Sequence, residues 1–306
     1  MTRDRTERYG RPERYGRPDE WEEHRAMSDR AGADAPTPQL AAELLALAQE
    51  AAARAGRLLR DGRPADLGVA ATKSSPIDIV TEMDVAAEKL ITGFLSERRP
   101  GDGFLGEEGG VSGGSSGVRW VIDPLDGTVN YLYGLPQWAV SIAAELDGEV
   151  VAAVVEAPMR RETYRAVRGG GAERLTPGAA PEPMRPRPSP PLDQALIGTG
   201  FNYVAAVRAA QASVAHRLIP RVRDIRRSGS AAIDLCDVAG GRLDGYYERG
   251  LAPWDLAAGD LIAREAGALT GGRTGRRPDG DLTVAASPGV FAVLQPLLDE
   301  LGAWHD

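Results

Sequence analysis

Residues 120–130 read Trp-Val-Ile-Asp-Pro-Leu-Asp-Gly-Thr-Val-Asn. The first three residues are apolar and predict a short buried strand, which runs into two carboxylates, Asp123 and Asp126, followed by a Gly-Thr pair. Asp-Pro and Asp-Gly are also common turn dipeptides, so the two acids taken alone could simply shape a loop. Acids gathered where a strand stops are, however, suitable ligands for a hard metal ion.

Two other stretches carry acids that can meet this pair. Glu107 lies in Gly106-Glu-Glu-Gly109, which predicts an acidic turn, and Asp255 follows Trp254 at the start of a helix-like segment. A role in shaping a loop would not predict an acid at either of these two places. Glu107 and Asp255 therefore favour the interpretation that the acids form a metal site. The ligands would all be carboxylates with no histidine nearby, which suits Mg²⁺ better than zinc because a hard cation prefers oxygen donors.

A pocket of four carboxylates repels a phosphate ester. Two charges a few Å apart repel by about 4 kcal/mol at an effective dielectric constant near 20. Divalent ions would reverse this field and acidify a bound water molecule. Backbone N–H groups at Gly127 and Thr128 could hold phosphate oxygens, since glycine allows a close approach. The sequence therefore indicates metal-assisted phosphate chemistry.

The composition is that of a folded, acidic protein. The chain has 306 residues, of which 42% are hydrophobic and 26% charged, so one large layered unit or two packed subdomains are expected. A formal net charge of -8 disfavours binding to nucleic acid or to a membrane surface. The single cysteine, Cys236, excludes an internal disulfide and is expected to be buried. No stretch predicts a membrane span or a secretory signal, so we expect a cytoplasmic protein.

Four segments are expected along the chain. Residues 1–38 contain a tandem Glu-Arg-Tyr-Gly-Arg-Pro repeat and almost no aliphatic residues, which predicts a disordered N-terminal arm. Residues 39–175 predict an N-terminal α+β subdomain that carries most of the metal ligands. Residues 176–191 hold seven prolines and predict a linker. Residues 192–306 predict a C-terminal α/β subdomain that completes the active site.

Hydrophobic periodicity predicts the individual elements. In the first half we expect helices over residues 39–59 and from Thr81, whose spacing to Asp84 resembles a capping box. The second of these helices should bury one side, made of Val85, Leu90, Ile91, Phe94 and Leu95. Asp147-Gly148 predicts a hairpin between strands 139–146 and 149–156, with a third strand at 163–167.

The second half alternates between strands and helices, which implies sheets covered by helices. Strands are expected at residues 196–198, 222–225, 243–247 and 282–286. Helices are expected at residues 205–218, 231–239, 255–266 and 289–301.

The chain resembles the inositol monophosphatase family, within the lithium-sensitive, magnesium-dependent phosphatase superfamily. The likeness spans about residues 40–300 and consists of several spaced motifs in the same order. They are Lys73-Ser-Ser-Pro-x-Asp78-x-x-Thr81-x-x-Asp84, Gly106-Glu-Glu108, Asp123-Pro-Leu-Asp-Gly-Thr128-x-Asn130, and Trp254-Asp-x-Ala-Ala-Gly259 leading to Glu265-Ala-Gly267.

The resemblance implies a role for individual residues. It implies metal ligands for two or three Mg²⁺ ions at Glu107, Asp123, the Leu125 carbonyl, Asp126 and Asp255. It implies that Glu107 and Thr128 activate a water molecule, with Asp84 hydrogen-bonded to Thr128. It implies substrate contacts from Asp126, Gly127, Thr128, Ala231 and Glu248.

The resemblance also implies a layered α-β-α-β-α sandwich, the α/β (α+β) fold of sugar phosphatases, and a homodimer. The expected activity is Mg²⁺-dependent hydrolysis of myo-inositol 1-phosphate or a similar polyol phosphate, a small-molecule phosphate ester. Fructose-1,6-bisphosphatase, histidinol-phosphate phosphatase and 3'(2'),5'-bisphosphate nucleotidase activities share the metal motifs and stay open. A non-catalytic regulatory scaffold is the alternative of another class, although every proposed ligand is present.

Overall fold

The computed structural model describes residues 37–64, 67–72 and 79–304. Most of the predicted N-terminal arm and the Lys73–Asp78 part of the first motif lie outside these ranges. Thr37 and Pro38 were expected to belong to the arm, but Thr37 caps the first described helix and Pro38 begins it. Proline suits the first helical position because its missing N–H would have no partner there.

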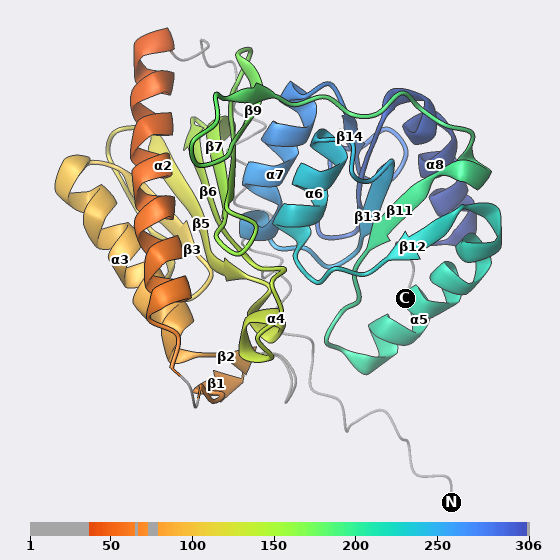
Figure 1. The fold of residues 1–306 in the computed structure, drawn as a ribbon, viewed down its shortest axis with the longest axis horizontal. Coiled ribbons are helices and arrows are strands. Elements are labelled where there is room, and N and C mark those ends of the chain that lie inside the picture. Colours follow the sequence, from red (N-terminus) through yellow and green to blue (C-terminus); the bar gives the residue numbers. More distant parts are fainter. Residues whose placement is uncertain (1–36, 65–66, 73–78, 305–306) are drawn as a thin grey trace, which may run out of the picture.

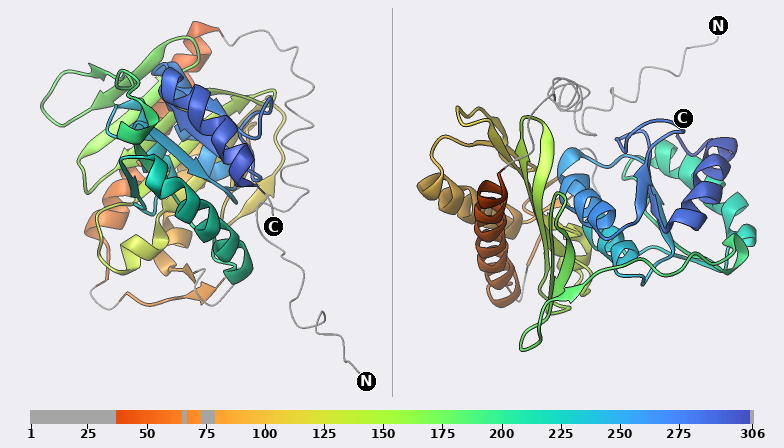
Figure 2. Two further views of the ribbon diagram at one scale, coloured as in Figure 1. Left: turned by 90° about the vertical axis from the view of Figure 1, so that its right-hand side faces the viewer. Right: turned by 90° about the horizontal axis from the view of Figure 1, so that it is seen from above.

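Helices and sheets alternate in five layers, which confirms the expected α-β-α-β-α sandwich (Figure 1 and the right panel of Figure 2). One outer layer contains α2 (Pro38–Asp61) and α3 (Glu82–Arg98). The middle layer contains α6 (Ala231–Ala239) and α7 (Pro253–Glu265). The other outer layer contains α5 (Ala205–Leu218) and α8 (Pro288–Leu301).

The first sheet has eight strands in the order β10-β9-β8-β7-β6-β5-β3-β4. The predicted hairpin is confirmed: Asp147 and Gly148 have φ of 50° and 84°, as a two-residue hairpin turn requires. Only β3 and β5 pair in parallel among these strands. The bounds are β3 (Gly103–Gly106), β4 (Gly110–Ser112), β5 (Val118–Asp126), β6 (Ala139–Leu146), β7 (Glu149–Ala157), β8 (Glu162–Val167), β9 (Gly171–Leu175) and β10 (Glu182–Pro183).

The second sheet has five strands in the order β12-β11-β13-β15-β14. Strand β11 is parallel to β12 and β13, whereas β15 is antiparallel to β13 and β14. The bounds are β11 (Leu196–Thr199), β12 (Asp224–Arg226), β13 (Gly245–Glu248), β14 (Leu269–Gly271) and β15 (Thr283–Ala286). The remaining short elements are β1 (Ala71–Thr72), β2 (Ile79–Val80), α4 (Thr128–Leu132) and the 3₁₀ turns Leu192–Gln194 and Ile219–Arg221.

Helix α3 differs from the sequence prediction on one residue of its buried face. Val85 is 51% exposed, whereas Ile91, Phe94 and Leu95 are buried as expected. At 100° per residue, the buried stripe instead runs through Asp84 and Glu88, so two carboxylates occupy positions that periodicity reserves for apolar side chains. This polar pair lies on the side of the helix that reaches the site described below.

The middle helices pack against both sheets. All nine residues of α6 are buried, and Cys236 is among them, as expected for a small apolar residue. One hydrophobic cluster joins residues such as Val155 of the first sheet to Leu235 and Leu261 of the middle helices. The chain crosses between the sheets through residues 184–191, and the division into two subdomains stays a prediction. In the part of the chain that the structure describes, no helix has the length and apolar character to cross a bilayer.

Candidate active site

A bulge in β5 brings Asp123 and Asp126 to the same side of the first sheet. Asp123 pairs with Ser141 and Asp126 with Ala139, so three steps along β5 oppose two along β6. Residues three apart on a regular strand point to opposite faces, and the extra residue cancels that difference. Pro124 lies inside the bulge, where its missing N–H costs no ladder hydrogen bond. The Asp-Pro-Leu-Asp sequence therefore presents two carboxylates together.

Glu107 lies beside Asp123 on the neighbouring strand. Gly106 of β3 is paired with Ile122 of β5, and the Glu107 N–H donates to the Ile122 carbonyl at 3.2 Å. The next residue on each strand is an acid, and the two carboxyl groups are hydrogen-bonded to each other. Because Glu107 is among the causes that raise the pKa of Asp123, after burial, the two carboxyl groups lie close together.

Asp255 reaches the same place from the second half of the chain. It lies in the first turn of α7, where its carboxylate accepts the Ala252 N–H at 2.7 Å and complements the helix dipole. The hydroxyl of Ser141, opposite Asp123, donates to the Trp254 carbonyl at 3.3 Å. Strand β6 thus fixes the start of α7 next to the two acids of β5.

Asp126 is held by the start of α6. Its carboxylate accepts the Ser230 hydroxyl at 2.5 Å and the Ala232 and Ala231 N–H groups at 2.8 and 3.3 Å. The backbone of Ala231, predicted to contact substrate, is therefore directed at a predicted metal ligand. Ser230 is also the N-cap of α6, with its hydroxyl accepting the Ile233 N–H.

Thr128 is fixed between two acceptors. Its hydroxyl lies 3.0 Å from the Asp84 carboxylate and 3.1 Å from the Leu125 carbonyl. Asp84 is buried and also accepts the Thr81 hydroxyl and N–H, at 2.5 and 2.9 Å, which confirms the predicted capping box. The preceding residue, Gly127, has φ of 95°, and a Cβ there would lie 2.8 Å from the Gln137 carbonyl. Only glycine fits this turn.

Glu248 closes another side of the cavity from the end of β13. The Tyr246 hydroxyl donates to its carboxylate at 2.5 Å. Gly200 follows the last residue of the adjacent strand β11, and a Cβ there would overlap the same carboxylate. Burial, opposed by the Tyr246 hydrogen bond and by Arg227, raises the pKa of Glu248 to about 7. This position of Glu248 therefore depends on a glycine that the sequence did not single out.

Burial and mutual repulsion raise the pKa values of the clustered acids. Burial and the charges of Glu107, Asp126 and Asp255 raise the pKa of Asp123 well above its ordinary value. Burial, Glu107 and Asp126 do the same for Asp255. Burial raises the pKa of Asp126 only to about 6, because the hydrogen bonds from Ser230, Ala232 and Ala231 oppose the shift. These acids favour protons or other cations at this place.

The predicted site residues line one cavity of about 400 Å³. They are Glu107, Asp123, Leu125, Asp126, Gly127, Thr128, Ala231, Glu248 and Asp255, while Asp84 lies behind Thr128. Within the described ranges, no three acidic, histidine or cysteine side chains already surround one point as a finished metal site. Asp123, Asp126 and Asp255 are each turned partly toward a donor of the chain itself. The donor set nevertheless fits a hard cation, because it consists of several carboxylates and a carbonyl group that line one cavity.

Several residues of the site were not predicted. Ser230 stands before an apolar helix, so its N-cap role could have been found from the sequence. Asn130 was part of a motif, and its amide donates to the Gln137 and Ser228 carbonyls at 2.6 and 2.9 Å, which ties α4 to the loop before α6. No local signal marks Ser141 or Gly200, because their roles depend on elements distant in the sequence.

Comparisons with known proteins agree with this geometry. The model of the Inositol monophosphatase family matches residues 40–301. Inositol-1-monophosphatase SuhB of Mycobacterium tuberculosis (strain ATCC 25618 / H37Rv) is 45% identical over 267 residues, which cover 81% of this chain and 91% of that protein. A protein named Nus factor SuhB from Escherichia coli (strain K12) is 39% identical over 268 residues, covering 84% and 97%.

Solved structures match as well. The structure of Mycobacterium tuberculosis SuhB has a TM-score of 0.73 at 41% sequence identity, and the match covers 86% of this chain and 98% of that chain.

Proposed function

The chain belongs to the inositol monophosphatase family, and on this premise we propose that it hydrolyses myo-inositol 1-phosphate or a similar polyol phosphate with the help of Mg²⁺. Membership makes it a phosphatase, and the family is metal-dependent and acts on small phosphate esters. The observation that carries the proposal is the convergence of Glu107, Asp123, Asp126 and Asp255 in one cavity, where burial and the charges of Glu107 and Asp126 raise the pKa values of Asp123 and Asp255.

The residues that would hold the cations are these four acids and the Leu125 carbonyl. Their excess negative charge would repel a phosphate, so the cavity needs cations before an anionic substrate can enter. Bound divalent ions would supply this charge and lower the pKa of a water molecule. We propose two or three such ions, in keeping with the number of oxygen donors.

Thr128 would orient the attacking water. Both neighbours of its hydroxyl, the Asp84 carboxylate and the Leu125 carbonyl, are acceptors, so the Thr128 proton must point at one of them. The oxygen lone pairs of Thr128 then stay available to accept a hydrogen bond from water in the cavity. Glu107, adjacent to Asp123, would take up the proton that this water loses.

The other end of the cavity would recognise the polyol. A carboxylate fixed at its place can accept hydrogen bonds from hydroxyl groups, and Glu248 is held by Tyr246 for this purpose. Gly127 and Ala231 line the same cavity, and the Ala231 N–H, which donates to Asp126 at 3.3 Å, would contribute to substrate binding through this metal ligand. Fructose-1,6-bisphosphate, histidinol phosphate and 3'(2'),5'-bisphosphate nucleotides are the alternative substrates, because the acids alone do not distinguish the alcohol.

Phosphate release from a panel of inositol, fructose, histidinol and adenosine phosphates, with and without Mg²⁺, tests the proposal. We expect turnover only with the metal and the highest kcat/KM for inositol 1-phosphate. Metal-independent turnover, or a preference for a bisphosphate by more than about tenfold, would contradict it, since such ratios reflect differential binding in the transition state.

We further propose a homodimer that works in the cytoplasm, as the family resemblance implies. Sedimentation of the purified protein tests the dimer. A regulatory scaffold remains the second class of function, because the name of the Escherichia coli relative is that of a Nus factor. Pull-downs with wild type and the Asp123→Asn variant discriminate the two: partners retained by the inactive variant would support a role that does not need turnover.

A further inference from the structure

Glu88 is a buried acid whose place the proposed function does not explain. It lies on α3, is 6% exposed, and its carboxylate accepts the Glu108 N–H at 2.9 Å and a hydrogen bond from the Gly109 N–H. A carboxylate taken out of water is costly unless hydrogen bonds satisfy it. Here both donors come from one short segment, the 106–109 turn, which carries Glu107.

Two glycines of this turn lie directly against the Glu88 carboxylate. A Cβ at Gly106 would come within 2.7 Å of it, and a Cβ at Gly109 within 2.5 Å. Neither glycine has a positive φ, so the backbone conformation does not demand glycine at these two positions. With Glu88 in its observed place there is no room for a Cβ at either position, so a larger residue there requires the Glu88 carboxylate to move.

Helix α3 thereby holds two acid-bearing segments at once. Asp84 accepts the Thr128 hydroxyl, just after Asp126, and Glu88, one helical turn later, accepts the N–H groups beside Glu107. Positions four apart share one face of a helix. A single rigid element therefore sets the distance between the Glu107 turn and the Asp126–Thr128 segment.

We propose that Glu88 is a positioning residue for the cation site: its carboxylate fixes the 106–109 turn so that Glu107 faces Asp123 and Asp255. The inference rests on the proposed function, because it assigns Glu88 to the metal ligand Glu107. Residues that orient metal ligands contribute to metal affinity without touching the metal, and their loss lowers metal affinity or activity by about 10- to 100-fold.

The first test is the isosteric change Glu88→Gln, with Mg²⁺ binding measured by calorimetry on the full chain. The glutamine oxygen can accept a hydrogen bond from one of the two N–H groups, but its NH₂ group then faces the other N–H and cannot accept from it. We expect the dissociation constant for Mg²⁺ to rise about tenfold, and KM for the phosphate ester at saturating Mg²⁺ to change less than about twofold. A general loss of structure would instead lower the melting temperature and change both quantities.

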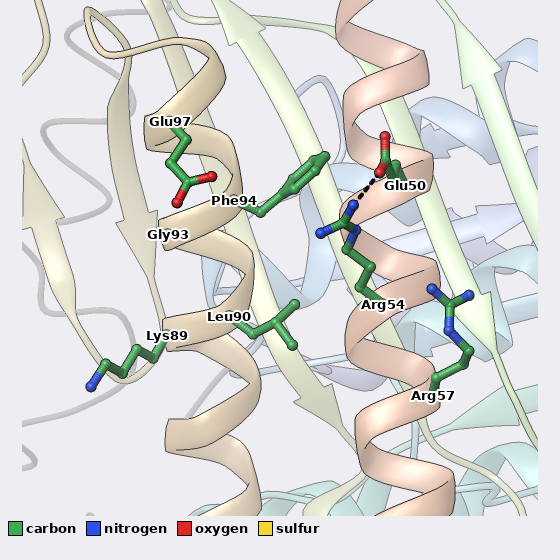
Figure 3. Close-up of a pocket in the computed structure, with 8 residues that line it drawn as sticks. All are labelled: Glu50, Arg54, Arg57, Lys89, Leu90, Gly93, Phe94 and Glu97. Atoms are coloured by element: carbon green, nitrogen blue, oxygen red, sulfur yellow. Dashed lines mark hydrogen bonds and ion pairs between the residues drawn. The ribbon is translucent and has the colours of Figure 1, made fainter.

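The matched control is Glu97→Gln on the same helix. Figure 3 shows Glu97 on α3 at the groove shared with α2, where Arg54 pairs with Glu50. Nine residues separate Glu97 from Glu88, which at 100° per residue places the two on opposite sides of the helix. Its side chain is 80% exposed and lies 4.0 Å from the neighbouring Arg98. Mg²⁺ affinity of this variant should equal that of wild type.

Gly109→Ala provides an independent route to the same effect. Its methyl group should push the Glu88 carboxylate out of place and weaken Mg²⁺ binding in the same way. In Glu88→Ala/Gly109→Ala the smaller side chain makes room, so the double variant should bind Mg²⁺ no more weakly than Glu88→Ala alone. Additive losses would overturn the inference, because they would mean that the two residues act separately.

The outcomes separate the two claims. If wild type binds Mg²⁺ and hydrolyses a phosphate ester while Glu88→Gln and Gly109→Ala bind Mg²⁺ equally well, the role of Glu88 is wrong and the proposed function stands. If wild type neither binds Mg²⁺ nor hydrolyses the panel, both are wrong. Should Glu88→Gln fail to fold, Gly109→Ala alone decides.

Discussion

Two regions of this molecule contain clustered acids between the first sheet and the middle helices. In one region the acids face other acids, and in the other they face arginines. In the acidic pocket, which comprises Glu107, Asp123, Asp126 and Asp255, the strongest charge effects on Asp123 come from the other three acids. In the arginine cluster, which comprises Arg160, Glu162, Tyr164, Arg174, Asp237 and Arg242, every carboxylate meets a guanidinium. Arg160 binds Asp237 through two contacts of 2.6 and 3.0 Å, and Arg242 contacts Glu162 at 2.7 Å.

Helix α6 takes part in both regions. Its first residues donate to Asp126, and Asp237 in its last turn pairs with Arg160, which lies in the turn between β7 and β8. Burial acts to raise the pKa of Glu162, but the hydrogen bonds from Arg242 and Tyr164 prevail and lower it. In the arginine cluster, side chains of the protein itself balance the negative charge of the acids. In the acidic pocket, bound cations would have to balance it.

The largest expected effect follows removal of Asp123 from the acidic pocket, which should abolish most turnover without lowering stability. We expect Asp123→Asn to lower kcat about 1000-fold or more, because a metal ligand is lost from a site that depends on charge. The melting temperature without metal should stay constant or rise, since one of several repelling acids has been removed. Steady-state kinetics and thermal denaturation in EDTA check both parts. Near-normal turnover would refute the assignment of the site.

The two regions should also respond to pH with opposite signs. Asp126 has a folded pKa of about 6 against an ordinary 3.8, so its stabilising contribution is fully present below pH 3.8 and is lost as the pH rises to 6. The shift corresponds to roughly 3 kcal/mol in metal-free protein. Glu162 has a lowered pKa, so its contribution is present above pH 4.5 and is lost as the pH falls.

Urea denaturation of wild type and Asp126→Asn in EDTA, between pH 4 and 7, measures this difference. The variant should show a flatter decline in the free energy of unfolding across pH 4 to 6. Parallel curves for the two proteins would mean that Asp126 does not titrate as its burial predicts.

A substitution in the arginine cluster should have the opposite result, with lower stability and unchanged turnover. Asp237→Ala leaves Arg160 without its two contacts, and Arg160 is only 21% exposed, so we expect a loss of about 2 kcal/mol in the free energy of unfolding. Turnover per folded molecule should stay unchanged, because the cavity acids are untouched. Asp224→Ala, which breaks an exposed pair with Arg226, is the matched control and should cost less than about 0.5 kcal/mol.

The smallest expected effect concerns the far wall of the acidic pocket. Glu248→Gln retains the shape of the side chain but weakens its acceptance of polyol hydroxyls, and Gly200→Ala should displace Glu248 by overlap. Both should reduce the preference for inositol 1-phosphate over other phosphate esters by about tenfold, with little change in Mg²⁺ dependence. Unaltered selectivity in a kcat/KM panel for both variants would exclude Glu248 from substrate recognition.

The sequence predicted well where a signal is local. The hairpin at Asp147-Gly148, the capping box of Thr81 and Asp84, and helix α6 at Ala231–Ala239 were all found, since turn chemistry, capping and periodicity depend on neighbouring residues. Strand β12 was predicted to begin two residues and end one residue too early. The short strands β3, β4, β9 and β14 were missed because three to five residues carry little periodicity.

The buried face of α3 could not be read from hydrophobicity. Periodicity favoured Val85 because apolar side chains usually define the inner face of a helix, but Asp84 and Glu88 occupy that face. Both acids are tolerated there because segments distant in the sequence bring donors to them, namely Thr128 and the Glu108 N–H. Such partners are invisible until the chain is folded.

The sequence by itself determined the helices, the longer strands and the chemical type of the proposed ligands, because local propensity and the hardness of oxygen donors are properties of the residues. Tertiary structure decided that Glu107, Asp123, Asp126 and Asp255 share one cavity. The β5 bulge turns two acids to one face, β3 places a third beside them, and Ser141 holds the start of α7 with the fourth. The physical reason is that the pKa values of these groups depend on burial and on charges a few Å away, and only folding creates those distances.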